Sequence, residues 1–236
     1  MKSKVWAVFF SLTTLLAGCG SGGEDFASQD PSAQAVSPNS FDIQLSWTIT
    51  ATYGYSKQMR ISGTCSGDMQ LAQTPHTELD NSSYRYKSQT LTGVIYNDCT
   101  DGSISSRPVS STLKTIQYDA NELDAYMEVD NKYGVWQSAP TFPTAAKVGD
   151  SGNIGEIALY DLNSHEGIGK EVWTYSVAPD TATTVIFNLV KTSYQASDLG
   201  HPTKTERNKY RVVPDDSLHL ISIHWVDDSG FVFHAQ

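Results

Sequence analysis

Histidines are the first candidates for metal chemistry in this chain, which contains six of them. His219 and His224 lie five positions apart on one expected strand, so their side chains should leave opposite faces. If residues 227–230 form the turn of the last hairpin, His224 faces Phe233, and His224 and His234 then also diverge. On this register no two of these three histidines converge, and we expect neither a metal nor another cofactor.

Two short stretches, 98–102 and 227–230, place aspartates beside glycine, as calcium-binding loops do. Both lack the more distant glutamate that completes such a loop. Aspartate, serine and glycine are also common turn residues, so we interpret both stretches as turns between strands.

Ser151 is the candidate nucleophile, because it lies in a Gly-Asp-Ser-Gly sequence at 149–152. This tetrapeptide resembles the nucleophile motif of chymotrypsin-like serine proteases, which also need a histidine base and a buried aspartate. The histidine that precedes Ser151, His76, lies in a polar stretch without an adjacent cysteine, and position 153 is Asn where those proteases have glycine. A tight turn explains the small residues better. If the chain is an enzyme, Ser151 with His165 is the pair to consider; we expect that it is not.

Aromatic side chains gather in the second half of the chain and could form a binding surface. The candidates are Trp136, Trp173, Tyr175 and Trp225, with Phe231 and Phe233 nearby. On one concave sheet face they could hold an apolar ligand or stack on sugars. The alternative, which we favour here, is that they fill the core beneath the sheet.

The first residues indicate export. A basic start, an apolar run at 5–16 and small residues after it are typical of a secretory signal over 1–18. Leu16-Ala17-Gly18-Cys19 resembles the lipobox of bacterial lipoproteins, which implies a lipidated Cys19 and attachment to a membrane. In that family Gly20 favours the outer membrane when the host has two membranes. A soluble secretion signal with a coincidental cysteine is the alternative. Residues 19–40 are rich in Gly, Ser, Pro and Ala and predict a flexible tether.

Once Cys19 is assigned to the anchor, Cys65 and Cys99 are the two cysteines that remain. Alternation places Cys65 on one face with Met59 and Ile61, and Cys99 on one face with Leu91 and Ile95. An even pair in an oxidising compartment predicts a disulfide bond.

Hydrophobic alternation predicts an all-β fold. Apolar residues alternate with polar ones over 41–53, which predicts a strand, and the pattern resumes beyond it. Two prolines within 138–143 interrupt the pattern. We expect a sandwich-like domain at 41–137 that carries the disulfide, followed by an antiparallel β-meander at 147–236.

Three stretches, 148–155, 179–184 and 206–211, are similar to segments of uncharacterised exported bacterial proteins. The resemblance would extend over most of 41–236. It implies a shared fold and no particular activity.

The chain carries 16 basic and 26 acidic residues, for a net charge of −10. Such a balance gives no electrostatic basis for nucleic-acid binding. We expect a membrane-anchored cell-envelope lipoprotein that serves as a structural or protein-interaction module, with other envelope proteins as its partners. The alternative is a binding module or carrier for an apolar or glycan ligand that uses the aromatic residues of the second half.

Overall fold

A computed structural model describes residues 37–75, 77–78, 86–100, 108–118, 123–129 and 131–236. Cys19 and the predicted signal and tether, up to residue 36, lie outside the described residues. The elements are α1 (Ile43–Tyr53), β1 (Tyr55–Gly63), β2 (Cys65–Gln73), β3 (Thr77–Glu78), β4 (Tyr86–Cys99), β5 (Pro108–Tyr118), β6 (Leu123–Val129), β7 (Lys132–Trp136), β8 (Ser151–Asp161), β9 (Gly167–Pro179), β10 (Val185–Gln195), β11 (Asp198–Val212), β12 (Leu218–Asp227) and β13 (Val232–Ala235).

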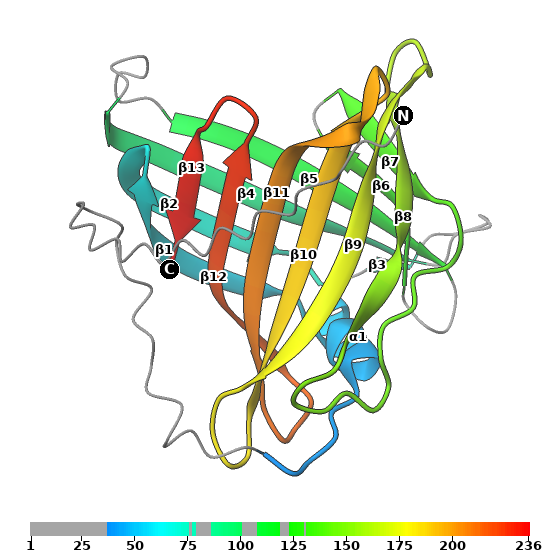
Figure 1. The fold of residues 1–236 in the computed structure, drawn as a ribbon, viewed down its shortest axis with the longest axis vertical. Helices are drawn as coiled ribbons and strands as arrows, with labels where there is room; N and C mark the ends of the chain where they lie inside the picture. The colour runs from blue at the N-terminus through cyan, green and yellow to red at the C-terminus, as the bar shows by residue number, and fades with distance from the viewer. Residues whose placement is uncertain (1–36, 76, 79–85, 101–107, 119–122, 130) are drawn as a thin grey trace, which may run out of the picture. The chain divides into compact units, whose positions relative to one another are not determined.

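The strands form one 13-stranded antiparallel sheet that closes on itself. From β4 to β13 each strand pairs with the next one in the chain, and Figure 1 shows β9 to β13 side by side in this order. The β1–β2 hairpin fills the gap between the two ends of this series, because β1 pairs with β13 and β2 pairs with β4. Closure gives every strand in the ring a partner on both sides and encloses an interior.

The all-β prediction is confirmed, and so is the antiparallel meander of the second half. The strands of 41–137 differ from the expected sandwich because they belong to the same sheet as the meander. The sheet is continuous across 138–143, since β7 and β8 on either side of that segment are hydrogen-bonded neighbours.

The strand predicted at 41–53 is wrong, because this segment forms α1. Asp42 caps the helix by accepting a hydrogen bond from the Leu45 backbone N–H at 2.8 Å, and Gly54 ends it with a φ of 67°. Alternation and a helix share every fourth position, so both patterns bury Ile43 and Ala51. Tyr53, which the strand pattern places inside, is 74% exposed.

One end of the interior is filled by α1 and by the loop before β8. Trp47 of α1 stacks on Phe142 of that loop, with ring centroids 4.8 Å apart. Phe41, just before the helix, pairs with Ala146 in an isolated β-bridge. All four of the apolar residues Phe41, Ile43, Phe142 and Ala146 are buried, so this end of the closed sheet is packed.

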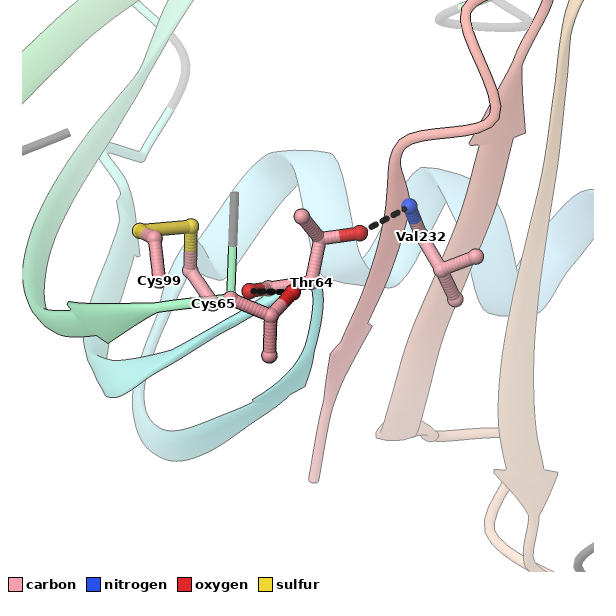
Figure 2. The surroundings of a disulfide bond; sticks show 5 residues. Thr64, Cys65, Cys99 and Val232 are labelled. Carbon is pink, nitrogen blue, oxygen red and sulfur yellow. Dashed lines mark hydrogen bonds between the residues drawn. A yellow bond between two sulfur atoms is a disulfide. The ribbon is translucent and has the colours of Figure 1, made fainter. Parts of the chain in front are cut away.

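The predicted disulfide between Cys65 and Cys99 is confirmed (Figure 2). It lies next to the joint where the β1–β2 hairpin meets β13, at which the Val232 backbone N–H donates to Thr64 Oγ1 at 2.9 Å. The β1–β13 pairing itself spans three residue pairs, from Ile61 opposite Ala235 to Gly63 opposite Phe233. The covalent bond therefore reinforces a short closing seam.

The predicted face of Cys99 needs a correction, although that of Cys65 is right. Cys65 is buried with Met59 and Ile61, as expected. Leu91 and Ile95 are exposed, whereas Cys99 is buried. The register between β2 and β4 shifts at this point, because Asp98 pairs with Ser66 and Tyr96 with Gly67, which leaves one extra residue in β4. Such a bulge inverts the alternation beyond it.

Candidate ligand-binding cavity

A cavity of about 660 Å³ lies inside the closed sheet, beside the packed end. Its floor includes Trp47, Thr50 and Ala51 of α1. This volume is within the range of small-molecule binding pockets. The walls differ in chemistry from one side to the other.

The first wall is apolar, and we call it the aliphatic wall. It is formed by inward-facing side chains of β2, β4 and β12: Met69, Leu71, Val94, Leu218, Leu220 and Ile223. Along β2 these side chains alternate with exposed residues, so the inner face of the strand buries them. In β12 a bulge at Ile221 interrupts the alternation, and Leu218, Leu220 and Ile223 are buried on either side of it. The aliphatic wall can accept only an apolar surface without a loss of hydrogen bonds.

A second wall, which adjoins the aliphatic wall where β11 pairs with β12, is charged, and we call it the polar wall. Directly paired residues share a face, so the register from β9 to β11 places Trp173, Lys191 and Glu206 side by side in one row. The neighbouring row contains Glu171, Ser193 and Lys204. Asn208 and Tyr210 follow on β11. Together these eight side chains form the polar wall.

Glu206 is the centre of the polar wall. Its carboxylate lies 3.4 Å from Lys191 Nζ and 2.9 Å from Lys204 Nζ, and it accepts a hydrogen bond from Asn208 Nδ2 at 3.0 Å. The side chains of Lys191 and Glu206 are each 20% exposed, and both line the cavity. Each of these two largely buried charges stabilises the other, because a single buried charge would lose its hydration without an opposite charge to compensate for it.

The pKa of Glu206 is lowered and that of Lys191 is raised, and both shifts favour the charged forms of the two groups. Burial disfavours the carboxylate of Glu206, but Lys191 and Lys204 outweigh it and hold the pKa of Glu206 below its ordinary value. Burial also disfavours the ammonium of Lys191, but the carboxylates of Glu206 and Glu171 outweigh it and raise the pKa of Lys191. The pair is therefore an ion pair across the neutral pH range.

Glu171 is held by two other groups of the polar wall. Its carboxylate accepts hydrogen bonds from Trp173 Nε1 and, at 3.0 Å, from Ser193 Oγ. Two tyrosines extend the polar surface: burial raises the pKa of both Tyr55 and Tyr210, so both hydroxyls stay neutral. The polar wall thus combines fixed charges with neutral hydroxyl groups.

Asn208 has an unpaired acceptor. Its side-chain Nδ2 donates to Glu206, which fixes the orientation of the amide. Its Oδ1 is buried and has no hydrogen-bond partner among the described residues. Asn208 is 5% exposed and lines the cavity. A buried acceptor of this kind is costly unless a donor reaches it.

The four predicted aromatic residues divide between cavity and core. Trp173 and Trp225 line the cavity. Trp136 packs against Trp173, with ring centroids 5.1 Å apart, and Tyr175 stacks on Phe187 at 5.8 Å. The ligand-binding role of all four residues stays a prediction.

Trp47 is the third tryptophan that lines the cavity, and it stacks on Phe142. The ring faces of Trp173 and Trp225 are also in contact with other side chains. Lys191 Nζ lies 4.6 Å from the ring centre of Trp173, and Lys204 Nζ lies 4.8 Å from that of Trp225. Trp225 also stacks on Phe231 and Phe233. Broad stacking of a sugar ring on either indole would have to displace these contacts.

The predicted divergence of His224 and His234 is wrong. The two residues are directly paired across β12 and β13, and their ring centroids are 6.0 Å apart. The last turn is longer than expected, since Val226 pairs with Val232 instead of Phe231, and this shifts the register by one residue. Within the described residues, no group of three or more His, Cys, Asp or Glu side chains could hold a metal ion.

Ser151 and His165 do not come together. Ser151 begins β8, whereas His165 lies beyond the other end of that strand, where its Nδ1 is 3.3 Å from Tyr133 Oη. Asp227 of the second acidic stretch accepts hydrogen bonds from Ser229 and Phe231, as expected of a turn. Part of the first stretch, 98–102, lies outside the described residues.

Comparison with known proteins gives no relatives: no family model, no curated protein and no solved structure matches the chain. Among the residues that the structure describes, no helix has the length and apolar character needed to cross a membrane. The site itself must therefore support any functional argument.

Proposed function

We propose that this protein is a non-enzymatic binding protein or carrier that holds a small ligand inside its closed sheet. The observation that carries the proposal is the cavity of about 660 Å³, whose lining combines an aliphatic wall with an adjoining polar wall. An interior that served only stability would be expected to be close-packed. A ligand with an apolar body and a polar end matches both walls.

An apolar ligand fits this cavity better than a glycan. The aliphatic wall offers no hydroxyl, amide or charged groups from its side chains. Lys191 lies over the ring of Trp173, and Lys204 and Phe233 contact the ring of Trp225, so neither ring offers a free face to a sugar. The competing interpretation, a structural or protein-interaction module, gives no reason for a cavity with an ordered polar wall.

Binding of the neutral fluorophore N-phenyl-naphthylamine tests the proposal. We expect saturable binding at one site per chain. The substitution Thr92→Trp adds a large side chain at a cavity-lining position, so it should weaken binding by about tenfold or more. Leu91→Trp adds the same side chain at the neighbouring exposed position and should bind as the wild type does. Unsaturable binding, or equal affinity of both variants, would count against the cavity as the binding site.

We also propose that Cys19 anchors the protein to a membrane of the cell envelope, the outer membrane if the host has two. The lipobox-like sequence supports this proposal, and an exported protein is consistent with the Cys65–Cys99 disulfide. We likewise propose that the chain shares its fold with uncharacterised exported bacterial proteins, on the basis of the similar segments at 148–155, 179–184 and 206–211. An anchored carrier would present its cavity to ligands or to envelope partners near the bilayer.

Incorporation of radiolabelled palmitate tests the anchor. Expressed in a bacterium that processes lipoproteins, the wild type should take up label and sediment with membranes, because acyl chains on Cys19 insert into the bilayer. Cys19→Ala should do neither, whereas Cys65→Ala should retain the label. A wild type without label, or a labelled Cys19→Ala, would contradict the anchor.

A further inference from the structure

Positive and negative charges are unequal in number around the cavity. Among the described residues that line it, the charged ones are the lysines Lys132, Lys191 and Lys204 and the glutamates Glu171 and Glu206. The tyrosines of the lining are neutral at neutral pH. The described lining therefore has one positive charge in excess, in a chain whose net charge is −10. A cleft with an excess of one sign attracts ligands of the opposite sign.

The two carboxylates of the lining already have partners inside the protein. Glu206 lies 3.4 Å and 2.9 Å from the two lysines of the polar wall. Glu171 accepts hydrogen bonds from Trp173 and Ser193. A cationic group on a ligand would have to compete with these partners, and the three ammonium groups of the lining would repel it. The lining therefore disfavours a cationic ligand.

Lys204 is the lysine of the polar wall that a ligand can reach most easily. Its side chain lines the cavity and is 37% exposed, compared with 20% for Lys191. An ammonium group has three N–H bonds, and Lys204 directs one of them at Glu206. An anionic oxygen beside it would accept a charge-assisted hydrogen bond, which is roughly twice as strong as one between neutral groups. Because this ammonium is partly exposed, the anion would keep part of its hydration, which limits the cost of its burial.

Two other carboxylates lie opposite lysines of the lining in the strand register. Asp161 pairs with Lys132, and Asp227 pairs with Lys204. Neither carboxylate lines the cavity, and each accepts hydrogen bonds from backbone N–H groups just after its own strand. Both are thus engaged in turns outside the lining, and the positive excess of the lining itself remains.

An aliphatic surface continues directly from Lys204 along β12. Lys204 Nζ lies 4.8 Å from the ring centre of Trp225. Ile223, Leu220 and Leu218 follow on the inner face of the same strand, toward the end of the cavity that α1 fills. A ligand with its polar group at Lys204 would therefore bury its apolar body against these side chains.

We infer that the ligand is an anionic amphiphile whose acidic head group, such as a carboxylate, accepts hydrogen bonds from Lys204 while its aliphatic body lies along the inner face of β12. This inference rests on the proposed function and specifies its ligand class. A neutral hydroxyl head group could also accept from Lys204, but it would gain neither the charge-assisted bond nor the attraction of the positive lining.

Three probes with the same alkyl chain test the inference at neutral pH: dodecanoate, dodecanol and dodecylamine, each measured by displacement of N-phenyl-naphthylamine. The wild type should bind dodecanoate about tenfold more tightly than dodecanol, and dodecylamine most weakly. Lys204→Met leaves Glu206 with Lys191 as its partner, so it should still bind the neutral fluorophore while it loses about tenfold in affinity for dodecanoate. Lys147→Met removes the same charge from an exposed lysine outside the lining and should behave as the wild type.

The comparison of the three probes on the wild type does not depend on how any variant folds. Dodecanoate that fails to displace the fluorophore, or that binds no more tightly than dodecanol or dodecylamine, would overturn the inference and leave the proposed function intact. A preference for dodecanoate that survives Lys204→Met would do the same. A wild type that binds neither the fluorophore nor any alkyl probe would overturn both.

Discussion

Replacing Glu206 by Gln is expected to lower the free energy of unfolding by roughly 3–5 kcal/mol, the cost of leaving a buried ion pair with one charge. Gln keeps the shape of the side chain, so the loss reports the uncompensated ammonium of Lys191 and not a void. The variant should show its deficit in urea unfolding followed by tryptophan fluorescence. Adding Lys191→Met should recover most of the loss, because the stranded charge is then gone.

The matched control is Glu156→Gln. Glu156 pairs with Lys170 at 2.8 Å, but these side chains are 31% and 30% exposed, so the expected loss is about 1 kcal/mol or less. If Glu206→Gln cost no more than this control, or if the double variant were less stable than the single one, the polar wall would not hold a tightly coupled pair.

The effect of Glu206 should also depend on pH with a defined sign. Its pKa in the folded protein lies below the ordinary value of 4.5, so the folded state favours the ionised form. Its contribution is therefore complete above about pH 4.5 and is lost as the pH falls further. The difference between wild type and Glu206→Gln should narrow over that acidic range.

Removing the disulfide by Cys65→Ala together with Cys99→Ala is expected to cost about 4 kcal/mol, since the bond closes a long loop. The two cysteines are separated by 34 positions, and the bond lies beside the short seam between β1 and β13. Loss of the bond should therefore destabilise the closed sheet as a whole. Thermal and urea unfolding of the double variant measure the effect.

Thr64→Val separates the covalent bond from the hydrogen bond at the same joint. It removes the acceptor of the Val232 N–H and should cost about 1 kcal/mol. A double cysteine variant that lost no more than Thr64→Val would show that the closing seam holds without the disulfide.

Much of the fold could be predicted because it depends on local patterns. Alternation along β10 to β12 and the turn residues between them predicted the meander, and the alternation at Met59, Ile61 and Cys65 placed one disulfide partner correctly. The helix α1 was missed because positions 43, 47 and 51 satisfy both a strand and a helix, and only the caps at Asp42 and Gly54 distinguish them. The extra residue in β4, which inverts the face of Cys99, has no recognisable pattern in the sequence.

Closure of the sheet and the polar wall could not be predicted in the same way. The seam pairs Ile61 with Ala235, and residues so far apart in the chain leave no local pattern. The polar wall did have a signal: Val185, Phe187 and Leu189 alternate inward and the same face continues to Lys191. A charged residue at an inward position usually indicates the end of a strand. It is expected inside a sheet only when the neighbouring strand is known to supply a residue of opposite charge.

Organic extraction of protein purified without detergent, followed by mass spectrometry, tests the central claim most directly. The wild type is predicted to release about one small amphiphile per chain. Thr92→Trp should release far less, whereas Leu91→Trp should match the wild type. A wild type that releases no small molecule, and that also fails to bind N-phenyl-naphthylamine, would contradict the claim that this cavity is a binding site.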